Sequence, residues 1–231
     1  MTRVALLASV AAVAAVAGVD LCQAETARPS THGVGDAHRA IAALPGSVTL
    51  YDQNNEVNGV AVISSDDDDV WSAYSSSGAD DFLVPQGHKW KVQQVEVTGI
   101  YVNGSGPAYS ENIAFYKDKH GLPGKLMAHC DEVLGKDNGG SFAIRLPKPC
   151  QVTLKGGATY WISVVANLTW NEFGIWEWET RDSQNGNAAA WENPGGGFER
   201  CPNWAVMTSC IGNYGEGPDF MFTLKGKDIL Q

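Results

Sequence analysis

The sequence predicts an all-β protein, an antiparallel β-sandwich with local disulfides. Three observations predict it. After residue 46 apolar residues recur at every second position in short runs, turn residues separate these runs, and four cysteines lie between residues 130 and 210. A period of two indicates strands with one buried face, and many short strands between frequent turns are typical of sandwiches. The chain of 231 residues is large enough for one such domain.

Four runs indicate individual strands. Residues 142–146 and 152–155 alternate between apolar and polar or small side chains, which predicts strands with one buried face. Residues 160–165 (YWISVV) are largely apolar on both alternating faces, which predicts a central strand. Residues 220–224 carry Phe, Phe and Leu at alternate positions and predict a final strand that closes the sheet.

The apolar pattern of residues 90–101 shifts phase in the middle of the run. Val92 belongs to one alternating set and Val95 to the other. One extra residue near Gln93 and Gln94 accounts for the shift, so the sequence predicts a β-bulge there.

Residues 1–24 have the features of a secretory signal peptide. A short positive start precedes an apolar run at 4–18, which is too short to span a bilayer comfortably. Cys22 and Ala24 occupy the small-residue positions of a cleavage site, so we expect cleavage after Ala24. A lipid anchor on Cys22 is the alternative, although Leu21 precedes it where a small residue would be expected.

The chain therefore divides into a signal peptide, a flexible linker at 25–46 with one short helix at 36–44, and a β-sandwich domain at 47–231. Removal of one Arg and one Asp with the leader keeps the net charge at −10. Such acidity argues against nucleic-acid partners, and nothing after the leader predicts membrane insertion. We expect a secreted protein, extracellular or periplasmic.

Four cysteines remain after cleavage, and an exported protein with an even number of cysteines is expected to form disulfides. Three pairings are open. The nearest-neighbour scheme joins Cys130 to Cys150 and Cys201 to Cys210. A zinc site is the competing interpretation, but the spacing lacks a C-x-x-C motif and the nearby His129 is interpreted as a loop residue.

Several stretches together resemble exported bacterial β-sandwich modules of unknown function, which occur alone or appended to secreted peptidases and cell-surface proteins. The resemblance implies a jelly-roll-like fold and carries no catalytic set. Its stretches are residues 79–92 (ADDFLVPQGHKWKV), 99–107 (GIYVNGSGP), 115–124 (FYKDKHGLPG), 190–198 (AWENPGGGF) and 217–224 (GPDFMFTL).

Glu177 and Glu179 lie on one face of a predicted strand at 174–180, with Trp176 and Trp178 on the other. Paired carboxylates on a jelly roll are the catalytic groups of a retaining glycosidase, so a secreted glycan hydrolase using this pair is the alternative function. The E-x-D-x-x-E pattern of jelly-roll glucanases is missing, which favours a solvated strand face instead.

A stretch rich in aspartate is a candidate calcium site, because calcium takes six to eight oxygen ligands. No other cofactor is predicted. Consecutive Asp side chains point in different directions and the EF-hand pattern is missing, so a solvated acidic loop is the simpler interpretation. The candidate ligands are Asp66, Asp67, Asp68 and Asp69, followed by Asp80 and Asp81, all expected in loops.

Aromatic and amide side chains between residues 170 and 204 predict a binding platform. Sugar rings stack on aromatic faces, and amides bind their hydroxyl groups. Trp170, Trp176, Trp191 and Asn193 are the candidate ligand-binding residues, expected in loops and sheet edges. The leading hypothesis is a non-catalytic module that binds a surface polysaccharide or a cell-surface protein.

Overall fold

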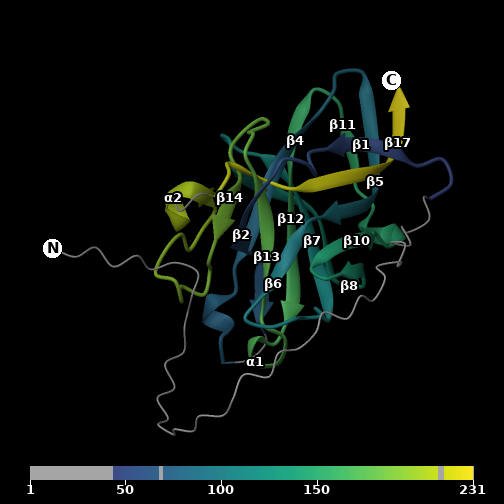
Figure 1. The fold of residues 1–231 in the computed structure, drawn as a ribbon. Helices are drawn as coiled ribbons and strands as arrows, with labels where there is room; N and C mark the ends of the chain where they lie inside the picture. Colours follow the sequence, from purple (N-terminus) through teal and green to yellow (C-terminus); the bar gives the residue numbers. More distant parts are fainter. Residues whose placement is uncertain (1–43, 68–69, 213–215, 231) are drawn as a thin grey trace, which may run out of the picture. The chain divides into compact units, whose positions relative to one another are not determined.

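The computed structural model describes residues 44–67, 70–212 and 216–230, and it is an all-β sandwich (Figure 1). The described strands pair antiparallel, with the exception of β3 (Ser65–Asp67), which lies parallel to β12 (Ala158–Leu168). The predicted antiparallel sandwich is therefore confirmed. The signal peptide and all but the last residue of the predicted helix at 36–44 lie outside the described residues.

The strands of the described residues form three sheets, named A, B and C. Sheet A has the order β1 (Val48–Asp52), β17 (Phe222–Leu230), β5 (His88–Val97), β10 (Ser141–Arg145) and β9 (Lys136–Asn138), with β11 (Thr153–Lys155) also on β5. Sheet B has the order β16 (Asp219–Phe220), β13 (Ile175–Arg181) and β2 (Val57–Ile63), with β6 (Gly99–Val102) also on β13. Sheet C has the order β15 (Ala205–Val206), β14 (Ala190–Glu192), β4 (Ser77–Val84), β12, β7 (Ser110–Asp118) and β8 (Pro123–Val133), with β3 on β12.

The described helices are short and connect strands. They are the 3-10 helices η1 (Ser72–Tyr74) and η2 (Lys148–Cys150) and the α-helices α1 (Trp170–Phe173) and α2 (Met207–Ile211). No helix in the described part of the chain has the length and apolar character needed to cross a membrane.

Sheets A and B join into one layer. The backbone N–H of Glu179 in β13 donates to the carbonyl of Thr98 (3.0 Å), and its carbonyl accepts from Met221 (3.0 Å), at the points where β5 gives way to β6 and β16 to β17. Sheet C packs against this layer through aromatic contacts. The ring of Phe82 on β4 lies 6.4 Å from Trp90 on β5 and 6.3 Å from Phe222 on β17.

The strands predicted at residues 142–146, 152–155 and 160–165 are confirmed. Phe142 and Ile144 on β10 and Leu154 on β11 point into the core, as their alternation predicts. Strand β12 lies between β4 and β7 and is buried on both faces, because neither of its alternating sets is polar. The run at residues 220–224 divides between two strands: Phe220 ends β16 in sheet B, and Phe222 begins β17 in sheet A. Strand β17 lies between β1 and β5, so it is an inner strand and the predicted closing role is wrong.

The predicted β-bulge is also present. In the pairing of β17 with β5, Lys225 faces Gln94 and Gly226 faces Val92, so Gln93 is the extra residue. A Cβ at position 226 would lie 2.0 Å from the carbonyl oxygen of Lys91, so only glycine fits opposite the bulge.

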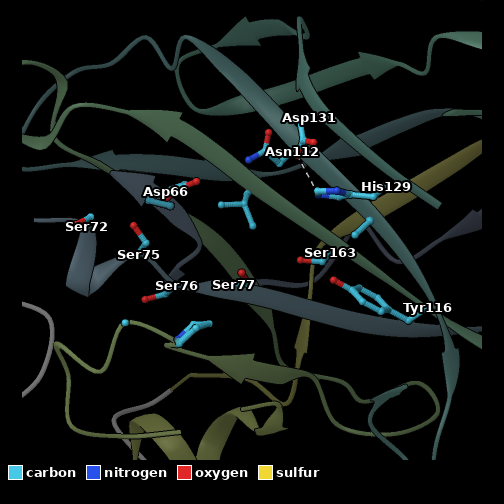
Figure 2. Close-up of a pocket in the computed structure, with 15 residues that line it drawn as sticks. Asp66, Ser72, Ser75, Ser76, Ser77, Asn112, Tyr116, His129, Asp131 and Ser163 are labelled. Carbon is cyan, nitrogen blue, oxygen red and sulfur yellow. Dashed lines mark ion pairs between the residues drawn. The ribbon is translucent and has the colours of Figure 1, made fainter. Parts of the chain in front are cut away.

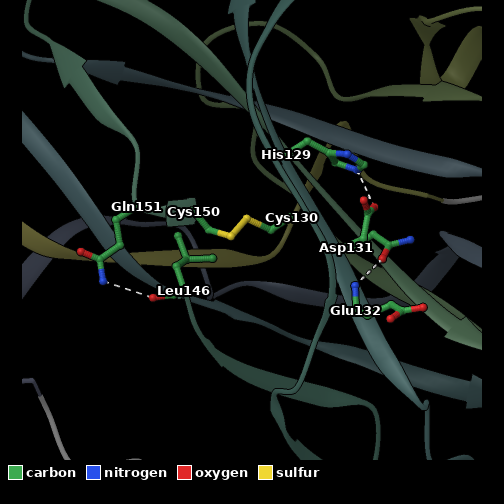
Figure 3. The surroundings of a disulfide bond; sticks show 8 residues. His129, Cys130, Asp131, Glu132, Leu146, Cys150 and Gln151 are labelled. Carbon is green, nitrogen blue, oxygen red and sulfur yellow. Dashed lines mark hydrogen bonds and ion pairs between the residues drawn. A yellow bond between two sulfur atoms is a disulfide. The ribbon is translucent and has the colours of Figure 1, made fainter. Parts of the chain in front are cut away.

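Two disulfides join the nearest neighbours in sequence, which confirms the local pairing. Cys130 on β8 is bonded to Cys150 in η2, with Cα atoms 5.8 Å apart (Figure 3), and Cys201 is bonded to Cys210 in α2, with Cα atoms 5.7 Å apart. All four predicted cysteines are used in this way, so the zinc interpretation is wrong.

The chain crosses from sheet B to sheet C at Ser64 and Ser65, and their buried hydroxyls bind both layers. Ser64 Oγ donates to the carbonyl of Val164 (2.6 Å) in sheet C. Ser65 Oγ donates to the carbonyl of Trp176 (2.7 Å) in sheet B and accepts from its N–H (2.8 Å). This crossing brings β3 into sheet C beside β12, where Ser65 and Asp66 line the candidate site.

Candidate binding groove

The predicted exposed platform is wrong for two of its three tryptophans. Trp176 is 0% exposed and Trp191 is 3% exposed. Both lie in strands rather than loops: Trp176 points inward from β13 against Phe142 (5.0 Å), and Trp191 on β14 donates its indole N–H to the carbonyl of Ile63 (2.9 Å). Their rings therefore belong to the core.

Asn193 is also buried, so its predicted ligand-binding role is corrected. Its side-chain amide donates to the carbonyls of Ala73 (2.9 Å) and Ser75 (2.8 Å), and its oxygen accepts from the N–H of Phe198 (3.0 Å). Because its amide nitrogen and its oxygen are hydrogen bonded to main-chain groups, Asn193 links the loop that follows β14 to the segment around η1.

Trp170 is the predicted platform residue that stays partly exposed. It opens α1 and lies 4.9 Å from Trp71 and 6.4 Å from Tyr74, measured between ring centroids. The Trp71 indole donates to Asn171 (3.3 Å). We call Trp71, Tyr74 and Trp170 the aromatic cluster. Sequence reasoning missed Trp71 and Tyr74, because only the segment after residue 170 was rich in tryptophan.

The acidic stretch is not one loop. Asp66 is exposed on β3, whereas Asp67 is buried and its carboxylate accepts from the N–H of Trp170 (3.1 Å) at the start of α1. Asp68 and Asp69 lie outside the described residues. Among the residues that the structure describes, no group of three potential ligands could hold a metal ion, so calcium at this stretch stays a prediction.

Asp80 and Asp81 lie within β4 rather than in the predicted loop, and both are buried. Asp80 accepts hydrogen bonds from the Gln53 amide (2.8 Å) and from the N–H groups of Phe220 (2.7 Å) and Asp81 (2.7 Å). Burial, reinforced by Asp219, raises its pKa well above the ordinary value. These contacts make Asp80 a structural link between the layers.

Glu177 and Glu179 lie on the outer face of β13 and the two tryptophans on its inner face, as the alternation predicts. The expected solvation is wrong for Glu177, which is only 7% exposed, because Ile63 and Ile100 flank it on the neighbouring strands. Burial raises its pKa to about 7 and also raises that of Glu179. The glycan hydrolase remains an alternative hypothesis that rests on this pair.

A polar cleft of about 460 Å³ opens on the outer face of sheet C (Figure 2). Its floor contains Ser163 and Val165 of β12, flanked by β7. One wall comes from the segment around η1 and the loop after β14, and contributes Ser72, Ser75, Ser76, Ser77, Pro194 and Gly195. The opposite wall comes from β7 and β8 and contributes Asn112, Tyr116, His129 and Asp131.

A second cleft of about 320 Å³ adjoins the first. Asp66, Asn112 and Asp131 line both, and Tyr109 and Glu132 lie in the second. We call the two clefts together the sheet C groove. Tyr116 stands at one end and Tyr109 near the other, seven positions apart, or roughly 20 Å along an extended strand.

Strand β8 turns its polar side chains toward the groove. Cys130 points inward to its disulfide, so His129 and Asp131 point outward, with His129 Nε2 3.1 Å from Asp131 Oδ1 (Figures 2 and 3). The interpretation of His129 as a loop residue is therefore wrong. The alternation about Cys130 was a signal in the sequence that could have placed both residues on one face.

A β-bulge in β8 exposes a further carboxylate. Glu111 pairs with Val133 and Ile113 with Cys130, which leaves one extra residue on β8. Glu132 adopts φ +53° there, and its N–H donates to the Asn112 side chain (3.0 Å). The bulge keeps Val133 in the core while Asp131 and Glu132 both stay exposed.

Side-chain amides fix the middle of the groove. Asn112 and Asn167 exchange two hydrogen bonds of 2.8 Å between β7 and β12, and Asn167 also donates to Ser110 (2.9 Å). Because each side chain is held by its neighbour, the two amides have fixed positions in the groove.

Two serines of the groove already use their hydroxyl protons in hydrogen bonds to main-chain carbonyls. Ser163 donates its hydroxyl to the carbonyl of Gly78 (2.7 Å) and Ser76 to that of Tyr74 (2.7 Å). Neither hydroxyl is hydrogen bonded to His129, so these groups do not form the relay that a serine hydrolase needs. The carboxylate, amide and hydroxyl oxygens of the groove can accept hydrogen bonds from hydroxyl and ammonium groups.

The groove carries negative charge. Asp66, Asp131 and Glu132 line it, and among the described residues no lysine or arginine does. At its end, burial and the nearby Glu192 carboxylate raise the pKa of Tyr116 to about 12, so this phenol stays neutral and can donate a hydrogen bond.

The fold and the groove together define a disulfide-linked β-sandwich with a polar face on one sheet. No protein-family model matches the chain, and no curated protein matches it either.

Proposed function

We propose that the protein is an exported, non-catalytic module that binds a carbohydrate chain in the sheet C groove. The observation that carries the proposal is the groove itself: two adjoining clefts lined by hydroxyl, amide and carboxylate groups, with a tyrosine near each end. Two disulfides fit an oxidising compartment outside the cytoplasm.

The lining favours a sugar chain over a protein partner. Protein interfaces centre on large apolar or aromatic anchors surrounded by a polar rim. The centre of this groove holds Asp66, Asn112 and Asp131 instead, and the aromatic rings stand toward its ends. Sugar hydroxyls can bind such polar groups while a ring face stacks on a tyrosine. The aromatic cluster lies beside the groove, because Ser65 and Ser75 contact both.

Replacement of Tyr109 tests the proposal with little effect on the fold. Tyr109 is 46% exposed and contacts Phe173 edge-on at 5.2 Å, and its hydroxyl donates to Thr169 (2.9 Å). Ring stacking contributes on the order of 1 kcal/mol, so Tyr109→Ala should weaken binding of a soluble oligosaccharide about fivefold. Isothermal titration with a panel of neutral oligosaccharides measures this.

Tyr109→Phe is the matched control, because it keeps the ring and removes only the hydroxyl. It should bind within about twofold of the unaltered protein, and both variants should keep a melting temperature near that of the parent. The proposal fails if no oligosaccharide in the panel binds the parent. It also fails if Tyr109→Ala binds as tightly as the parent does.

A further inference from the structure

We infer that the sheet C groove selects a cationic polysaccharide, an amino-sugar polymer with free amines, over its uncharged and anionic counterparts. This inference rests on the proposed carbohydrate-binding function and specifies its ligand class. It follows from the charge and hydrogen-bonding character of the groove rather than from its shape.

The charge of the groove is complementary to that of a cationic ligand. Asp66, Asp131 and Glu132 line the groove, the chain carries a net charge of −10, and none of the described lining residues is lysine or arginine. His129 pairs with Asp131 at 3.1 Å, whereas Asp66 and Glu132 form no ion pair with any other described residue. An anionic polymer would be repelled, and an ammonium group would find an unpaired carboxylate.

The hydrogen-bonding groups of the groove also favour a ligand that donates. Carboxylates only accept hydrogen bonds, and the hydroxyl protons of Ser76 and Ser163 are already used by main-chain carbonyls. At these carboxylates and these two serines the groove presents acceptors to a ligand. An ammonium group donates three hydrogen bonds, whereas an acetylated amine donates one and adds a carbonyl that needs a donor.

Matched oligosaccharides separate charge from shape. A β-1,4-linked glucosamine hexamer and the N-acetylglucosamine hexamer of the same linkage share a backbone and differ in charge. Each exposed ion pair is worth roughly two- to fivefold in affinity, so the glucosamine hexamer should bind about tenfold tighter at pH 5.5 and 20 mM NaCl. This advantage should shrink at 300 mM NaCl, because salt screens exposed charges. Polygalacturonate should not compete.

Asp66→Asn localises the attraction, because Asp66 is exposed and lines both clefts. This variant should lose about two- to fivefold in affinity for the glucosamine hexamer and stay within twofold for the acetylated hexamer. Asp182→Asn is the control: Asp182 is exposed just after β13 and does not line the groove. It removes the same charge and should change neither affinity.

The outcomes separate the inference from the proposed function. If the acetylated hexamer or a neutral glucan binds as tightly as the glucosamine hexamer, the inference is overturned and the carbohydrate-binding function stands. An equal loss in Asp182→Asn and Asp66→Asn would overturn the inference too, because the attraction would then come from the net charge of the protein. If no oligosaccharide binds, the proposed function itself fails.

Discussion

Trp191→Ala is expected to destabilise the fold by about 3–5 kcal/mol, the usual cost of truncating a buried tryptophan. Trp191 is 3% exposed, its ring lies 5.8 Å from Phe198, and its indole N–H donates to the carbonyl of Ile63. Truncation leaves a cavity and a buried carbonyl without its donor. Urea unfolding followed by circular dichroism measures the loss of stability. Thermal unfolding should show a melting temperature lower by roughly 10 °C.

Trp191→Phe is the matched control, since it keeps an aromatic ring and removes the donor. It should cost clearly less than the alanine variant. A Trp191→Ala protein with the melting temperature of the parent would contradict the core position of this ring. That result would instead agree with the exposed position that the sequence predicted for Trp191. Any loss of binding in the variant could then be assigned to direct contact of Trp191 with the ligand.

The protein is expected to be more stable at pH 4.5 than at pH 8. Burial is the main cause that raises the pKa of Asp81 to about 6 and of four further carboxyls to about 7; these are Glu111, Glu177, Glu192 and Asp219. In the unfolded chain these groups ionise near pH 4. Between pH 4 and about 7 the folded state therefore keeps protons that the unfolded state has lost.

The sign follows from this difference in bound protons. The free energy of unfolding falls as the pH rises through that window, and it levels off once the folded groups have ionised. One pKa unit corresponds to about 1.4 kcal/mol. Ionisation of these buried carboxyls together should therefore lower the free energy of unfolding by several kcal/mol by pH 8. Midpoints of urea unfolding at pH 4.5, 6 and 8 measure this change in stability. A midpoint that is constant or rises with pH would contradict the prediction.

Glu177→Gln isolates one of these groups. The variant keeps the shape of the side chain and cannot ionise, so it should match the parent at pH 4.5 and exceed its stability at pH 8 by about 2–3 kcal/mol. Glu172→Gln, at an exposed position in α1, is the matched control and should show no such gain. Glu177→Gln would also abolish hydrolysis if Glu177 were a catalytic carboxyl. A glycan hydrolysis assay that compares Glu177→Gln with the parent therefore tests the alternative function.

Local pattern was enough to predict the long strands. Residues 160–165 are apolar on both faces, and this alone places β12 in the middle of a sheet. The phase shift around Gln93 predicted the bulge, because an extra residue must move every later side chain to the other face. The cysteine spacing suggested the pairing, since short loops favour bonding between neighbours in the chain.

The groove depends on contacts that local pattern does not encode. Strand β3 joins β12 in parallel across about 100 residues of sequence, and this pairing brings the segment around η1 beside sheet C. Strand β14 has three residues, too few for its period to be recognised, so Trp191 was assigned to a loop. The wall formed by Asp131 and Glu132 depends on a bulge whose register is set by β7.

The central claim is that a carbohydrate chain binds in the sheet C groove, and chemical-shift mapping tests it most directly. Isotope-labelled protein is titrated with the oligosaccharide that binds best, and backbone amide signals are followed to saturation. The account predicts that the largest changes cluster at Tyr109, Asn112 and His129, on β7, β8 and the segment before β7. Saturable changes centred on Glu177 and the outer face of sheet B, with the groove signals unmoved, would contradict it.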